Sequence, residues 1–217
     1  MTIDDAYFSR ADGEGTRRKP VAAPRKRRTR GEREMLTRED WIATARAALI
    51  KSGIGAVRIV PLAKALGVTR GGFYWHFKGR RDLLDALLDD WEHTNTAPFE
   101  RIVQQDRRDG HAEFQALVDL WVAEKEYSPA WDSALRNWAA LSKQAAAVVK
   151  RVDEHRIALI REIFLHLGYS DPEALVRARI TYFHQVGYYA LALGESPSER
   201  RELLPVYIAA LLGKTPR

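Results

Sequence analysis

The sequence predicts an all-α fold of about nine helices, and three observations lead to this prediction. From Thr37 onward, apolar residues recur at the helical spacing of i, i+3 and i+4. These runs begin at Ser, Thr or Asp and end at Gly or Pro, as helices do. No segment of the sequence alternates as a strand would, and no internal repeat is evident. With 217 residues and 46% hydrophobic content, the chain can bury a sizeable core.

Residues 1–34 form a polar, basic arm that contains the run RKRRTRGER. Pro20 and Pro24 interrupt any helix there, so we expect the arm to be disordered. It either binds DNA phosphates or a narrow minor groove as a tether, or it is a solvated tail or an upstream extension ahead of a start at Met35. Residues 1–90 carry 19 Lys and Arg against 12 Asp and Glu, whereas residues 91–217 carry 16 against 17. This asymmetry fits a front module that meets a polyanion.

Residues 35–82 contain the front helices. The first is predicted from Thr37, which with Asp40 makes an N-terminal cap, to Gly53. A short helix follows at residues 61–66, and Gly67 begins a tight turn. A second short helix is then expected at residues 69–77. Two short helices joined by such a turn predict a helix-turn-helix, whose second helix reads the major groove of DNA.

Residues 83–217 are predicted to be helical almost throughout. The helix that begins at Leu83 contains Pro98, which we expect to kink or interrupt it. Shorter helices follow at residues 114–121 and from Ser128 onward, and a long one contains residues 148–167. Asp171 is expected to cap the next helix, which ends near residue 194, and Ser198 to begin a last one that ends at residue 213.

The stretch GVTRGGFYWHF crowds aromatic rings behind two glycines. Each glycine costs about 1 kcal/mol in helix propensity relative to alanine, but it lets the backbone approach the base edges of DNA closely. Arg70 is then well placed to bind guanine. The spacing of Phe73 and Phe77 assigns them to the inner face of the helix. The intervening Tyr, Trp and His side chains are left outside, where each could donate a hydrogen bond to phosphate.

The stretch VPLAKALGVTRGGFYWHFKGRRDLL resembles the helix-turn-helix signature of the TetR family of bacterial transcriptional repressors. The strict match covers residues 58–84, and the likeness in architecture extends over residues 37–213. The resemblance implies a three-helix DNA-binding domain at residues 35–82 and a larger helical domain at residues 83–217 that binds an effector and dimerises. Two features depart from the family pattern: Arg58 replaces the usual Ser or Thr cap, and the turn at residues 78–81 is more basic. From the resemblance and the chemistry together, the predicted DNA-facing residues are Arg58, Thr69, Arg70, Gly71, Gly72, Tyr74, Trp75, His76, Lys78 and Arg80.

By the same resemblance, the chain is a homodimer that reads a palindromic operator and is released by a small effector that tilts the helix starting near Leu83. A physical reason supports the dimer, because one short recognition helix reads only a few base pairs and two copies double the readout. The alternative for the last two helices is packing within one chain. The predicted interface residues are Leu175, Tyr182, Phe183, Val186, Tyr189, Val206, Tyr207, Ala210 and Leu211.

The rear part of the chain is rich in aromatic residues, which predicts an apolar pocket for a hydrophobic or aromatic effector. His184 and Tyr188 lie four residues apart and could supply polar contacts. The alternative for each ring is an ordinary place in the core. The predicted pocket residues are Trp91, Trp121, Trp131, Trp138, His184 and Tyr188.

Other classes of protein are disfavoured by the sequence. It has no cysteine, its six histidines lack metal-binding spacing, and no phosphate-binding loop or GxSxG element is present. We therefore expect no enzyme activity, cofactor or metal, although an all-helical enzyme built from scattered residues remains an alternative. A second alternative is a constitutive, architectural DNA-binding protein whose rear domain only dimerises. The lack of a long apolar run or signal sequence leads us to expect no membrane contact and a cytoplasmic, nucleoid-associated location.

Overall fold

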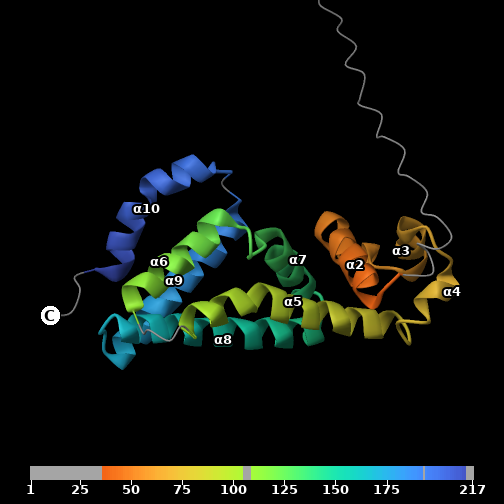
Figure 1. Cartoon of the computed structure of the whole chain (residues 1–217), viewed down its shortest axis with the longest axis horizontal. Helices are drawn as coiled ribbons and strands as arrows, with labels where there is room; N and C mark the ends of the chain where they lie inside the picture. The colour runs from red at the N-terminus through yellow and green to blue at the C-terminus, as the bar shows by residue number, and fades with distance from the viewer. Residues whose placement is uncertain (1–35, 105–108, 193, 214–217) are drawn as a thin grey trace, which may run out of the picture.

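The computed structural model describes residues 36–104, 109–192 and 194–213, and within these ranges it contains nine α-helices, one 3₁₀ helix and no strand (Figure 1). The prediction of an all-α fold is confirmed. The arm predicted at residues 1–34 lies outside the described residues. None of the described helices combines the length and the apolar composition that a span across a bilayer requires.

The front helices are α2 (Arg38–Ser52), the 3₁₀ helix η1 (Ile54–Ala56), α3 (Ile59–Leu66) and α4 (Arg70–Phe73). The predicted cap of α2 is confirmed, because the Thr37 hydroxyl accepts from the Asp40 N–H and the Asp40 carboxylate accepts from the Thr37 N–H. Gly67 ends α3 in the left-handed region, with a φ of 74°, where a side chain would be strained. The helix-turn-helix is thus formed by α3, this turn and α4.

The recognition helix is shorter than the sequence predicted. Regular α-helix ends at Phe73 rather than near Phe77, and the chain continues as turns. The N–H groups of His76 and Phe77 both bond to the Phe73 carbonyl, each at 3.0 Å. This tightened turn brings the Phe77 ring onto the Phe73 ring, with their centroids 5.2 Å apart. Two adjacent glycines make a longer helix costly, and packing of the rings decides where it ends.

The long helices α5 (Arg80–Val103) and α8 (Lys143–His166) lie side by side along the molecule (Figure 1). They run in the same direction, because contacts join residues at a nearly constant separation, such as Asp85 to Gln144 and Glu92 to Arg151. Of the two expected effects of Pro98, interruption of the helix is wrong, since α5 continues through it, and a kink stays a prediction. The guanidinium of Arg156 on α8 donates to the carbonyl of Asn95, which holds the helix just before the proline.

The remaining helices are α6 (Gly110–Ala123), α7 (Pro129–Ala139), α9 (Asp171–Leu191) and α10 (Pro197–Leu212). The predicted cap of α7 is confirmed, because the Ser128 hydroxyl accepts from the Trp131 N–H. The last two helices begin slightly earlier than predicted, with Ser170 and Ser196 as their N-caps. Ser196 and Glu199 form a capping box, a signal that the sequence already carried.

Two hydrophobic clusters make up the core. The front cluster joins α2, α3 and α4 to the first half of α5, to α7 and to the first half of α8. The rear cluster joins the second halves of α5 and α8 to α6 and α9. The division between the clusters therefore falls within α5 and α8, some way beyond residue 82. The predicted domain boundary at residues 82 and 83 stays a prediction.

Candidate nucleic-acid interface and effector cavity

The front helices α2 to α4, with the turn up to Phe77, form what we call the reading head. Phe73 holds its inner face. This side chain is 0% exposed, and its ring meets the Trp41 ring edge-on at 5.2 Å and stacks on Phe77. The predicted inward orientation of Phe73 and Phe77 is confirmed. Rigid attachment of a short helix matters, because α4 is too short to be stable by its own hydrogen bonds.

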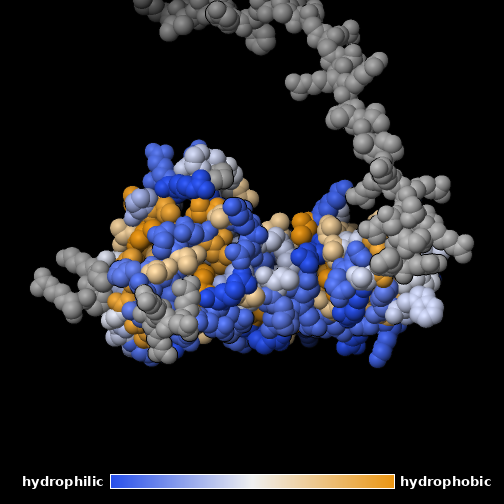
Figure 2. Space-filling view, viewed as in Figure 1, coloured by the Kyte–Doolittle hydropathy of each residue, from blue (hydrophilic) through white to orange (hydrophobic). Residues whose placement is uncertain are grey.

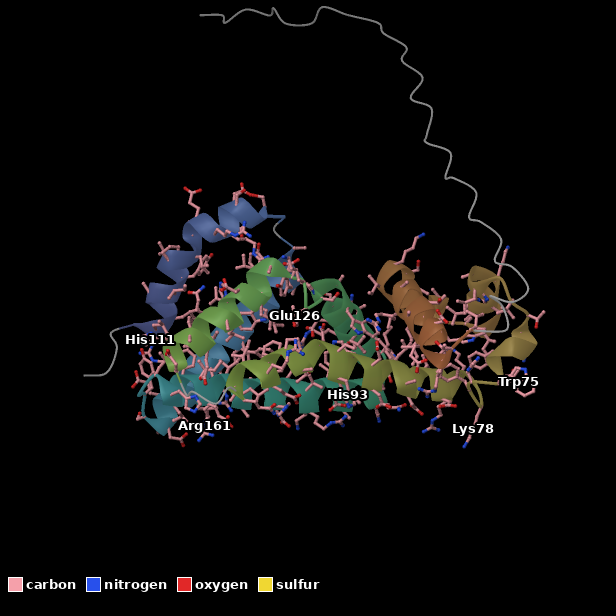
Figure 3. All side chains as sticks on the ribbon, viewed as in Figure 1. Trp75, Lys78, His93, His111, Glu126 and Arg161 are labelled. Atoms are coloured by element: carbon pink, nitrogen blue, oxygen red, sulfur yellow. The ribbon has the colours of Figure 1, made fainter. Side chains whose placement is uncertain are left out.

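The outer face of the same helix is open. Thr69, Arg70, Tyr74 and Trp75 are exposed, and Trp75 is the most extreme at 88%. Arg70 Nη2 donates to the Tyr74 hydroxyl at 2.8 Å, so the two side chains form one polar unit. Figure 3 shows Trp75 and Lys78 at the end of the molecule farthest from α10. Exposure of this much aromatic and cationic surface is typical of a binding face.

Gly71 and Gly72 are not required by the fold. Neither has a positive φ, and a Cβ added at Gly71 would come no closer than 3.6 Å to its neighbour, the Thr69 hydroxyl. At Gly72 the nearest atoms, in Val68, would lie 3.9 Å away. These are ordinary contact distances. Alanine would fit at both positions and would favour the helix, so the reason for glycine lies outside the chain's own packing.

The other predicted DNA-facing residues differ in their surroundings. Arg80 is held by the protein itself, because its Nε donates to the Val57 carbonyl at 2.7 Å and its Nη2 to the Ile54 carbonyl at 3.2 Å. Arg58 is exposed at the N-cap of α3, and among the described residues its side chain caps no backbone N–H. Lys78 is exposed, and His76 is half-buried.

An apolar cavity of about 60 Å³ lies between α6, α9 and α10. Figure 2 shows hydrophobic side chains around the hollow beneath α10. Three of the predicted pocket residues line this cavity: Trp121, His184 and Tyr188. Partial removal from water lowers the pKa of His184, which favours its neutral form. The apolar lining comes mainly from Phe114, Val118, Trp121 and Val122 on α6 and from Leu204, Tyr207, Ile208 and Leu211 on α10.

The other three predicted pocket residues lie elsewhere. Trp91, Trp131 and Trp138 are buried in the front cluster, and the cavity does not include them. The structure therefore does not bring them together with His184 and Tyr188. The sequence left open that each of these rings has an ordinary place in the core, and that alternative applies to all three.

Sequence reasoning missed Thr181 and Gln185, which also line the cavity. Both are buried, and within the described residues neither Thr181 Oγ1 nor Gln185 Nε2 has a hydrogen-bond partner. A signal was present: Thr181, His184, Gln185 and Tyr188 are spaced i, i+3, i+4 and i+7, which puts them on one face of α9.

A buried ionic network lies between the two clusters. Arg156 is 0% exposed, and its Nη1 donates to Asp132 Oδ1 at 2.8 Å. Arg136 donates to the same carboxylate at 2.7 Å and, with two nitrogens, to Asp153. Burial opposes ionisation of Asp132, but the two guanidinium groups hold its pKa below the ordinary value. Tyr182 on α9 joins the network by donating to Asp153 at 2.6 Å. The network thus ties α9 to α7 and α8.

The outward faces of α9 and α10 expose large apolar side chains. Val176, Ile180 and Phe183 on α9 are 54%, 53% and 59% exposed, at a spacing that places them on one stripe. On α10, Leu203, Val206 and Tyr207 are also exposed. Of the predicted interface residues, Phe183, Val206, Tyr207 and Ala210 are exposed, whereas Leu175, Val186, Tyr189 and Leu211 are half-buried and Tyr182 is buried within the protomer.

Comparison with known proteins gives matches both to the reading head alone and to about four fifths of the chain. Residues 42–87 match the family model described as bacterial regulatory proteins, tetR family. The transcriptional regulator TtgR of Pseudomonas putida is 39% identical over 69 residues, so the match spans 32% of this chain and only 32% of the length of TtgR. The transcriptional regulator SrpR of Pseudomonas putida is 26% identical over 179 residues, which cover 79% of this chain and 68% of SrpR.

Solved structures extend the likeness to the rear helices. A transcriptional regulator from Rhodococcus sp. Rha1 superposes with a TM-score of 0.65 at 20% identity, covering 82% of this chain and 96% of that one. NemR of E. coli, in its reduced form, superposes with a TM-score of 0.64 at 17% identity, covering 83% and 99%. At these identities the structures establish the shared fold alone. Residues 42–87 therefore form a domain similar to that of the tetR family of bacterial regulatory proteins, and the chain shares its fold with solved transcriptional regulators.

Proposed function

We propose that the chain is a transcriptional regulator that binds a near-palindromic DNA operator as a homodimer, acts as a repressor, and is released by a small hydrophobic effector. The observation that carries this proposal is the exposed face of α4. Arg70 on α4 and Tyr74 and Trp75 in the turn after it are exposed, and the adjacent glycines of α4 have no function in the chain's own packing. A face of this kind suits close approach to the major groove.

Dimerisation would use the outward faces of α9 and α10. Monomeric proteins rarely leave a contiguous apolar stripe in water, and Val176, Ile180 and Phe183 form one on α9. A two-fold contact there would set the separation of two reading heads, and half-sites one turn of DNA apart would fit them.

The effector would occupy the cavity beneath α10, at the end of the rear cluster away from α4. The link between the two sites is physical, because α5 begins at the reading head and ends in the rear cluster. Release needs the effector to bind the DNA-free arrangement better than the DNA-bound one. Acting on an operator, the protein would be located at the nucleoid in the cytoplasm.

A gel-shift titration tests the function directly. The protein is titrated onto the duplex that flanks its own gene and onto random duplex, at near-physiological salt. Selective binding at nanomolar concentration is expected. Equal, salt-sensitive binding to both duplexes, with no sequence enriched by selection from a random DNA library, would instead indicate an architectural protein. Absence of binding to any duplex would contradict the proposal.

A further inference from the structure

The cavity beneath α10 contains two buried polar groups whose hydrogen bonds are not made within the described chain. Thr181 is 2% exposed and Gln185 is 8% exposed, and both line the cavity from α9. Thr181 Oγ1 and Gln185 Nε2 have no partner among the described residues. Most buried polar groups in folded proteins have one, so two on one wall of a single cavity indicate a ligand that supplies it.

The kind of partner follows from the chemistry of these two atoms. An amide nitrogen is a donor only, and a hydroxyl can donate as well. Four residues apart on a helix, the two groups lie on the same face, so they can donate to one shared oxygen. The missing group is therefore a hydrogen-bond acceptor, such as a carbonyl oxygen.

The charges around the cavity favour a neutral ligand. The lining has one guanidinium, Arg200, and one carboxylate, Glu195. Arg200 is already engaged, because it donates to the Glu124 carboxylate at 2.6 Å and to the Trp121 carbonyl at 3.0 Å. The lowered pKa of His184 keeps its ring neutral near pH 7. An anionic ligand buried here would meet no unengaged cation to offset the loss of its hydration, and a cationic group could not accept hydrogen bonds from Thr181 and Gln185.

The size of the cavity assigns a function to α10. The cavity volume is about 60 Å³, whereas a cavity of about 150 Å³ is known to hold benzene. A ring-sized ligand therefore enters only if a wall moves. That wall is α10, because none of its side chains described at residues 198–212 is fully buried, whereas α6 and α9 are anchored in the rear cluster.

We propose that this cavity binds a neutral, mostly apolar molecule whose carbonyl oxygen accepts hydrogen bonds from Thr181 and Gln185, and that α10 moves outward to admit it. This inference rests on the proposed function only in naming the class of effector. Movement of α10 would displace Leu203 and Val206, which are exposed on the face of α10 that the proposed dimer would use.

Matched pairs of small molecules test the class of ligand without DNA. Acetophenone and 2-acetylnaphthalene are titrated against ethylbenzene and 2-ethylnaphthalene, which have nearly the same shape but no oxygen. Benzoate and benzylammonium serve as the charged members. Binding is followed by ¹⁹F NMR of protein labelled with 5-fluorotryptophan, in which the Trp121 signal is assigned from the Trp121→Phe variant. At least one ketone is expected to bind about tenfold more tightly than its hydrocarbon and than either ion.

Two variants connect this preference to the named groups. Gln185→Leu and Thr181→Val keep the shape of the side chains and remove the donors. Each should weaken ketone binding several-fold and leave hydrocarbon binding unchanged or tighter. The controls are Gln115→Leu and Thr94→Val, the same changes at exposed positions outside the cavity, and they should alter nothing. A melting curve for each variant confirms that it folds.

Three outcomes would overturn the inference: neither ketone binds up to its solubility limit, ketone and hydrocarbon bind equally, or the preference survives in both variants. Failure to bind DNA would leave it intact, because the assay contains none. Ketone binding without DNA release would retain the site and reject only its regulatory function.

Discussion

The glycine pair of the reading head allows stability and DNA binding to be separated. Replacing Gly71 and Gly72 by alanine should make the protein more stable and at the same time weaken its binding to DNA. Most substitutions that impair function do so by damaging the fold, and this pair is predicted to act in the opposite direction.

The gain in stability follows from the space around each glycine. The nearest atoms to an added Cβ lie at 3.6 Å for Gly71 and 3.9 Å for Gly72, so neither alanine meets a clash. Each substitution then contributes about 0.5–1 kcal/mol through backbone entropy and helix propensity. For a chain of this length, a total of about 1–2 kcal/mol raises Tm by about 2–8 °C.

The loss of binding follows from geometry at the DNA. Hydrogen bonds from Arg70 to a base need donor and acceptor about 2.7–3.2 Å apart, and two methyl groups on the approaching backbone would hold the helix outside that range. Loss of one bidentate contact costs about 1–3 kcal/mol, or about 5- to 150-fold in Kd. Calorimetry gives Tm, and gel-shift titration on a selected operator gives Kd. Gly55→Ala is the matched control, since a Cβ there meets no atom within 4 Å and so causes no clash either. A double variant that binds DNA as tightly as the original protein would refute the argument for close approach.

Three further predictions concern the head, the network and the dimer. Arg70→Ala should cost about 1–3 kcal/mol in operator binding and relax the preference at one base pair; an unchanged preference in competition with operator variants would contradict this. Arg80→Ala loses two bonds to backbone carbonyls, so it should lower the free energy of unfolding, measured by urea titration, by about 1–3 kcal/mol and leave sequence preference unchanged. The pKa of Asp132 in the folded state lies below its ordinary value of 3.8, so the stability from its ion pairs should be complete above pH 3.8 and lost as the pH falls through the folded-state pKa. The unfolding free energies of the original protein and of Asp132→Asn should therefore converge as the pH is lowered. Phe183→Glu places a charge on the exposed stripe of α9 and should produce monomers in sedimentation velocity, whereas the control Leu165→Glu on α8 should not. A Phe183→Glu protein that remains dimeric would exclude the stripe as the interface.

Local signals in the sequence predicted most of the helices. The capping box at Thr37, the turn at Gly67 and the serine cap of α7 each depend on residues close together in the chain, so their effect can be read from spacing. The end of α4 and the continuation of α5 through Pro98 could not be predicted from the sequence, because both depend on contacts with distant segments. Phe73 is fixed by the Trp41 ring, and the backbone before Pro98 is held by Arg156.

The residues of the candidate sites were likewise predictable where spacing decides their place, and unpredictable where distant contacts do. The exposed face of α4 follows from helical spacing, because the inner positions are occupied by phenylalanines. The face of α9 that meets the core could not be chosen, since apolar residues lie on both sides of that helix: Tyr182 points inward, and Phe183 outward. The ionic network was also beyond sequence reasoning. Spacing pairs Asp132 with Arg136 on α7, but it cannot show that Arg156 on α8 is folded against the same carboxylate.

The front cluster has a consequence for the exchange of reading heads between related regulators. Its members include Trp131, Trp138 and Val152, which lie far along the chain from the helix-turn-helix. A head cut at residue 82 would leave behind the α7 side chains that lie beside Leu49, and would lose part of its core. Evolution by fusion at that junction would thus need compensating changes in α7 and α8. A chimaera that carries a foreign head should fold well only when those two helices come from the same parent.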